Sequence, residues 1–81
     1  MEDRTEAQRT HDYMAMGHSI VLIDGIIAGD LMVDKSPEDR NHTVERNVKH
    51  LESMVSKTDW DNVDFTDANS AISAGNGYTA S

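Results

Sequence analysis

Four histidines are the residues of this sequence best suited to binding a metal ion. His11 and His18 are seven positions apart and His42 and His50 are eight apart, so on helices each pair would be separated by about two turns. A compact two-histidine site uses positions i and i+4, and the Glu-x-x-His pattern of di-iron bundles is missing. Glu38 and His42 have the i, i+4 spacing, but this pair more often supports a helix. We predict no metal site and no cofactor, while a symmetric oligomer could still bring copies of His18 or His50 together.

The acidic run from Asp59 to Asp67 resembles a calcium-binding loop only superficially. The glycine expected at the sixth loop position is Asp64, an oxygen ligand is replaced by Val63, and the final bidentate glutamate is Ser70. We interpret these aspartates as helix caps and a solvated acidic turn.

Residue patterns that support catalysis are also missing. No serine lies in a Gly-x-Ser-x-Gly elbow, and Gly75-Asn76-Gly77 does not form a phosphate-binding motif. The sequence has no cysteine, which excludes thiol catalysis, thiolate zinc sites and disulfides. We therefore predict that the protein is not an enzyme.

Composition predicts one small domain over residues 1–81 with a thin core, because 37% of residues are hydrophobic and 5% aromatic. The net charge is −8, and residues 58–81 contain four aspartates and no Lys or Arg. An acidic surface repels phosphate backbones, so we predict no nucleic-acid partner.

No membrane segment or secretion signal is expected. Asp24 and Asp30 interrupt the apolar run from Ile20 to Val33, which is too short to span a bilayer. The first nineteen residues are polar, unlike a signal peptide. We expect the protein in the cytoplasm.

The clearest element is a helix over residues 37–56. Ser36 is a suitable N-cap, Pro37 suits the first helical position, and acidic residues follow in the first turn. An apolar stripe repeats along it at spacings of four, three and four: Val44, Val48, Leu51 and Val55.

A second amphipathic pattern predicts a helix over residues 4–28. Its stripe steps by three and four through Tyr13, Met16, Ile20, Ile23 and Ile27. Further apolar residues make residues 20–28 hydrophobic on nearly every side, so we expect partners around this half and predict self-association. A β-hairpin turning at Asp24-Gly25 is the alternative. We favour the helix because no third strand is available, with Gly29 as its left-handed C-terminal stop.

The C-terminal third should fold back over these helices. Trp60 and Phe65 are the expected anchors, since the chain has few aromatic residues. Thr66 could cap a short helix over residues 67–74 that ends at Gly75, leaving residues 76–81 as a loose tail.

Three segments carry a resemblance: Arg46-Asn47-Val48-x-His50-Leu51-x-x-Met54, then Trp60, then Ala71-Ile72-x-x-Gly75. In order and spacing they resemble short proteins of tailed-phage genomes and environmental viral sequences, over roughly residues 30–78. The resemblance implies a viral context, with the host cytoplasm or the virion as the expected location, and no particular activity.

The same helix offers two polar predictions. Asn47 borders the apolar stripe and could set the register of an oligomer, as a buried asparagine does in coiled coils. Arg46 and His50 share a side face and could meet an aspartate of the C-terminal segment, with a solvated helix face as the alternative.

The sequence thus predicts an all-α helical hairpin, closed at one end by a short third helix with Trp60 and Phe65. We expect a homo-oligomer, most simply a dimer, whose interface is formed by the two apolar stripes and whose structural anchors include Ser36 and Asn47. The expected function is a self-associating viral interaction or assembly protein. Two alternatives remain: an acidic inhibitor of a basic site on a host protein, and a small metal-binding bundle.

Overall fold

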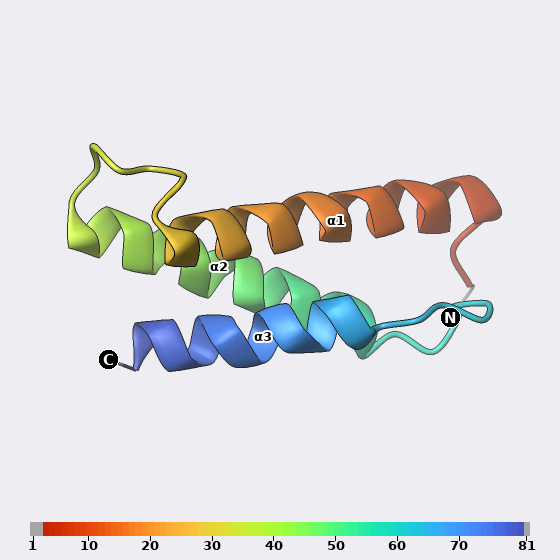
Figure 1. The fold of residues 1–81 in the computed structure, drawn as a ribbon. Helices are drawn as coiled ribbons and strands as arrows, with labels where there is room; N and C mark the ends of the chain where they lie inside the picture. The colour runs from red at the N-terminus through yellow and green to blue at the C-terminus, as the bar shows by residue number, and fades with distance from the viewer. Residues whose placement is uncertain (1–2, 81) are drawn as a thin grey trace.

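The computed structural model describes residues 3–80, which form three packed helices: α1 (Glu6–Ala28), α2 (Pro37–Val55) and α3 (Thr66–Thr79). Helices α1 and α3 run in the same direction. Helix α2, which comes between them in the sequence, runs antiparallel to both (Figure 1). The all-α prediction is confirmed. Residues 1–2 and 81, the last of which belongs to the predicted loose tail, lie outside the described residues.

Helix α1 begins and ends at local signals. The Thr5 hydroxyl accepts a hydrogen bond from Gln8 N, and the Gln8 side chain accepts one from Thr5 N, which completes a capping box. At the other end Gly29 adopts φ 83°, as the left-handed stop requires. Asp24 and Gly25 lie within the helix, so the hairpin alternative is wrong.

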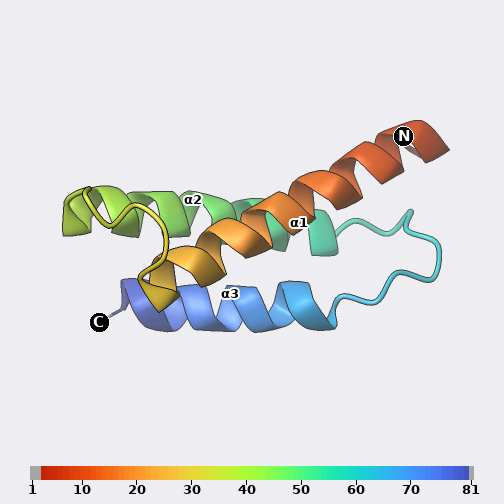
Figure 2. The same ribbon diagram turned by 45° about the horizontal axis from the view of Figure 1, so that its top comes forward.

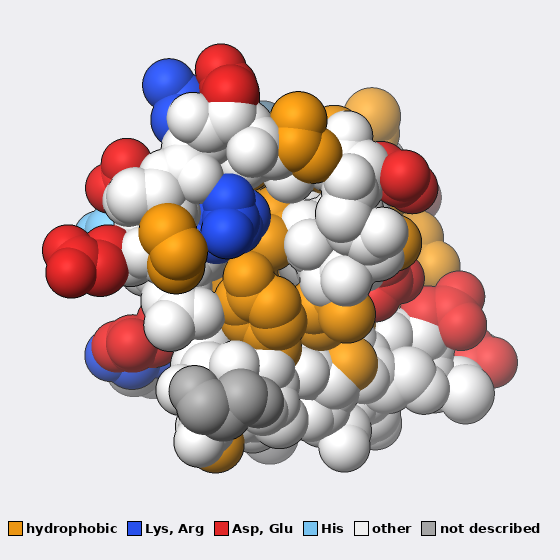
Figure 3. All heavy atoms as spheres, turned by 60° about the vertical axis from the view of Figure 1, so that its left-hand side comes forward, with side chains coloured by type: hydrophobic (Ala, Val, Ile, Leu, Met, Phe, Trp, Pro, Cys, Tyr) orange, Lys and Arg blue, Asp and Glu red, His pale blue; other side chains and the backbone are white. Residues whose placement is uncertain are grey.

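Gly25 has a packing role that its sequence position did not reveal. A Cβ atom at this residue would lie 2.4 Å from Leu31 Cδ1, so any larger residue would require the Leu31 side chain to move. Leu31 and Met32 lie in the connection between α1 and α2 and are half-buried against the core, whereas Val33 is 67% exposed. At this end of the bundle, hydrophobic side chains gather at the surface within a partly acidic rim (Figure 3).

Helix α2 begins where the sequence indicated. Ser36 Oγ accepts a hydrogen bond from Asp39 N at 3.1 Å, and Pro37 is the first helical residue.

Substituting Ser36→Ala should lower the free energy of unfolding by about 1 kcal/mol, because one N–H of the first turn loses its acceptor. Ser53→Ala is the matched control, since Ser53 is exposed near the other end of the same helix. It should leave stability equal or slightly higher, because alanine has the better helix propensity. Urea unfolding of both variants measures the difference, and equal losses would contradict the capping role.

Helix α3 differs most from expectation. It extends to Thr79, so neither the stop at Gly75 nor the loose tail after it is correct. Thr66 is its first residue and not its cap, and Asp64 Oδ1 accepts hydrogen bonds from both Thr66 N and Thr66 Oγ1. The helix continues past Gly75 because that glycine is buried against α2, where a Cβ would lie 2.3 Å from Val48 Cγ2.

The core lies where the three helices meet, and it draws on all of them. The buried apolar residues are Met16, Ile23, Ile26, Val44, Val48, Leu51, Ala68 and Ala71. Small residues on α3 let it pack against both other helices. Helix α3 is therefore a full layer of the bundle and not a cap on one end of a hairpin, and it covers apolar surface of α1 within the same chain.

The N-terminal half of α1 extends beyond the pair formed by α2 and α3 (Figure 2). The linker between α2 and α3 runs out alongside this extension in both views (Figures 1 and 2). The molecule measures 41 × 21 × 20 Å along its principal axes. The extension and the linker together provide the surface described next.

Candidate functional site

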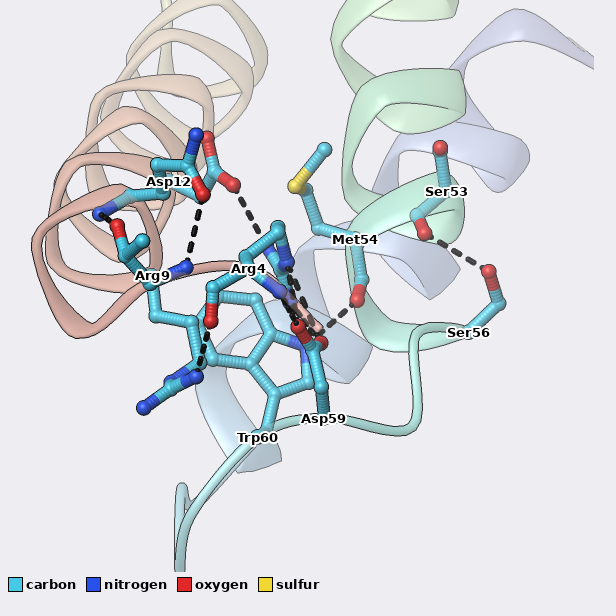
Figure 4. A network of polar contacts seen from close by, with 10 residues as sticks. Arg4, Arg9, Asp12, Ser53, Met54, Ser56, Asp59 and Trp60 are labelled. Carbon is cyan, nitrogen blue, oxygen red and sulfur yellow. Dashed lines mark hydrogen bonds and ion pairs between the residues drawn. The ribbon is translucent and has the colours of Figure 1, made fainter. Parts of the chain in front are cut away.

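Arg4 joins the start of the chain to the linker (Figure 4). Its backbone N–H and its guanidinium both donate to the Asp59 carboxylate, with Arg4 N 2.9 Å from Oδ2 and Nε 3.0 Å from the same oxygen. Another guanidinium nitrogen donates to Asp12 Oδ2 at 2.6 Å. The side chain of Asp59 is only 8% exposed, so this ion pair is largely shielded from water.

The electrostatics of this pair follow from its geometry. The Arg4 hydrogen bonds and charge hold the pKa of the Asp59 carboxyl far below its usual range. The hydrogen bonds to Asp59 and Asp12 raise the pKa of Arg4 in turn. Both groups stay charged at any pH near neutrality.

Trp60 extends the same cluster. The Arg4 guanidinium lies 4.3 Å from the centre of the indole ring, a cation–π distance. Trp60 Nε1 donates to Met54 O at 2.8 Å, and the ring meets Phe65 edge-on with centroids 5.7 Å apart. The prediction that both aromatic residues anchor this segment agrees with these contacts, which tie the linker to the ends of α1 and α2.

An open groove separates the extension of α1 from the linker. Glu6, Arg9, Thr10 and Tyr13 form one wall; Trp60, Asp61, Asn62, Val63 and Asp64 form the other. Its volume is about 520 Å³, within the range of ligand-binding clefts. A second hollow of about 210 Å³ shares Tyr13 and Asp64 with it and continues towards Ile20 and Phe65. The groove therefore runs along α1 from the linker to the start of α3.

Asp64 stands where the two hollows meet. Its hydrogen bonds from Thr66 lower the pKa of its carboxyl, so the group is ionised at neutral pH. The linker turns beside it at Asn62, which has φ 49°, a left-handed conformation that asparagine tolerates.

His50 and its neighbours on α2 do not reach the linker aspartates. His50 Nδ1 lies 2.8 Å from Ser19 Oγ, which links α2 to α1. Arg46 is exposed, and Asn47 donates to Thr43 O within its own helix. The expected contact between Arg46 or His50 and an aspartate is thus replaced by one that the sequence analysis missed, between Arg4 and Asp59.

The aspartates of the linker are spread among separate partners. Asp59 binds Arg4, Asp61 lies 3.7 Å from Arg9, and Asp64 caps α3. Among residues 3–80, no three His, Asp or Glu side chains are grouped closely enough to hold a metal ion.

The predicted interface residues divide between core and surface. Met16, Ile23, Val44, Val48 and Leu51 are buried within the bundle, and Ile20 and Val55 pack partly against them. Tyr13 and Ile27 remain exposed. The two stripes therefore serve mainly to hold α1, α2 and α3 together.

Comparison with known proteins finds no matching family model, no matching curated protein and no matching solved structure. Across the described residues, no helix has the length and hydrophobicity needed to cross a membrane.

Proposed function

We propose that this chain is a non-enzymatic interaction protein that self-associates through the outward face of α1. The observation that carries the proposal is a line of exposed, uncharged residues, here called the outer stripe: Met14, Gly17, Val21 and Ala28. Met14 is 70% and Val21 62% exposed, although both are large apolar side chains. Their spacing of three, four and seven matches the repeat by which helices pack together.

Two further features support a binding role over a catalytic one. Ser19 and His50 form a hydrogen-bonded pair of the kind used for nucleophilic catalysis, but Ser19 is only 3% exposed between helices. A substrate could reach its hydroxyl only if α1 and α2 separated, so we assign the pair a structural role. Gly17 leaves open space above the helix backbone, which would let a second helix approach closely.

The resemblance of residues 30–78 to tailed-phage proteins supports a viral setting for this assembly. We place the protein in the host cytoplasm or the virion on that basis.

The test is molar mass in solution, by light scattering after size exclusion at low and high salt. The wild-type protein should form a dimer whose stability changes little with salt, because the outer stripe is uncharged. Met14→Glu/Val21→Glu should weaken the dimer about a hundredfold or more, since each change removes a buried apolar side chain and adds a charge.

The matched control is Ser53→Glu/Ser73→Glu, which adds the same charge at exposed positions of α2 and α3. The control should dimerise like the wild type. A monomeric wild type, or a control that dissociates as readily, would overturn the proposal.

A further inference from the structure

The groove between α1 and the linker has a surplus of negative charge. Four carboxylates lie along it, those of Glu6, Asp61, Asp64 and Asp67. Arg9 is the one cation among its described lining residues, and its guanidinium already donates to Arg4 O and lies near Asp61. A ligand that fits this charge pattern must be positively charged.

The same groove exposes aromatic and aliphatic surface between the carboxylates. Tyr13 is 52% exposed and lines both hollows. Trp60 and Val63 line the first hollow, and Ile20 and Phe65 line the second, all of them half-buried. A small inorganic cation would leave most of this apolar surface exposed to water, whereas a peptide with large apolar side chains would bury it.

The groove is also held open before any ligand arrives. The Arg4–Asp59 pair fixes the start of α1 to the linker, and the Trp60 indole is held by its hydrogen bond to Met54 O. A wall that is already ordered loses little conformational entropy on binding.

We propose that this groove binds a basic, amphipathic peptide segment of a partner protein, with Lys or Arg side chains meeting the carboxylates and a large apolar side chain resting between Tyr13 and Trp60. Charge complementarity and the apolar floor together select this ligand over a nucleic acid, which the carboxylates repel. The groove adjoins the outer stripe at Gly17, which lines its second hollow, but the carboxylates and aromatic residues of the groove are not part of that stripe.

Trp60 makes the test direct, because it is the sole tryptophan and lines the groove. The probe is a synthetic twelve-residue peptide of alternating Lys-Lys-Leu-Leu blocks, titrated into the full chain while tryptophan fluorescence is recorded. Two comparison peptides replace Lys by Glu or Leu by Ser. We expect a saturable signal with the Lys/Leu peptide, about tenfold weaker binding with the Lys/Ser peptide, and none with the Glu/Leu peptide.

Net charge alone would also attract a basic peptide, so the variants are matched for charge. The groove variant is Glu6→Gln/Asp61→Asn/Asp64→Asn/Asp67→Asn; asparagine at 64 keeps an oxygen acceptor for Thr66. The control neutralises four exposed carboxylates elsewhere, as Asp24→Asn/Asp30→Asn/Asp34→Asn/Glu52→Gln. We expect at least a tenfold loss of affinity in the first and less than a threefold change in the second at low salt.

Circular dichroism establishes that both variants are folded before titration. Equal losses in the two variants would show non-specific attraction and overturn the proposal. Equal binding of the Glu/Leu peptide would also overturn the proposal. So would a wild-type dimer that becomes monomeric when Tyr13→Ala is introduced, because a second copy of the chain would then occupy the groove.

Discussion

Replacing Gly75 with leucine is expected to lower the free energy of unfolding by about 1–3 kcal/mol or more, because the new side chain has no space between α3 and α2. The first added carbon would already lie 2.3 Å from Val48 Cγ2 and 3.3 Å from Val44 Cγ1. Valine side chains in a helix have one preferred rotamer, so they cannot easily turn away. Thermal unfolding followed by circular dichroism gives the measurement.

Gly77→Leu is the control for that experiment. Gly77 lies in the same helix and is exposed, and a Cβ there would meet nothing within 4 Å. Leucine should therefore raise stability, by up to about 1 kcal/mol, since it forms helix better than glycine. A loss of similar size at both positions would show that helix α3 does not pack as described.

The clash can be tested further by making room on the facing helix. Gly75→Ala and Val48→Ala should each destabilise the protein, but the double variant should be more stable than the sum of the two losses predicts. The alanine methyl at 75 would then occupy the volume vacated by Val48. Strictly additive losses would argue against direct contact between these residues.

The second large effect concerns acid stability. Asp59→Asn should lower the melting temperature by several degrees at pH 7, because Arg4 loses the carboxylate that anchors it. The folded state lowers the pKa of Asp59, so its contribution is complete well above the unfolded value of about 3.9. That contribution declines as the pH falls below about 5 and is lost as the pH passes the folded value. The melting temperatures of the wild type and Asp59→Asn should therefore converge on acidification.

Asp61→Asn tests whether this effect belongs to the buried pair or to any linker carboxylate. The Asp61 side chain is 86% exposed and its nearest oxygen is 3.7 Å from Arg9, so water screens the interaction. The melting temperature of the Asp61→Asn variant should stay within about one degree of the wild type across the pH range. A difference between Asp59→Asn and the wild type that does not change with pH would rule out the ion pair as the cause.

Much of the fold could be predicted because its signals are local. The capping residue Ser36 lies next to the turn that it stabilises, and Gly29 terminates α1 by its own backbone conformation. The three–four spacing of apolar residues also determined that Asp24 and Gly25 lie in a helix.

The role of α3 could not be read from propensity. Glycine costs about 1 kcal/mol in a helix interior, so propensity alone predicts that the helix stops at Gly75. Its continuation depends on Val48 of another helix, 27 positions away in the sequence. The buried residues of α3, which are Ala68, Ala71 and Gly75, recur at helical spacing. This small-residue stripe is the sequence signal that could have predicted a helix continuing through Gly75.

The sequence by itself determined three things about this protein: where α2 begins, where α1 ends, and most of the apolar residues that the two helices bury. Only the tertiary structure decided how α3 covers those residues and how the groove forms. The Arg4–Asp59 pair spans 55 positions, and no spacing rule relates residues so far apart. Their contact exists because the bundle places the extension of α1 beside the linker, where an arginine and a carboxylate shielded from water must pair.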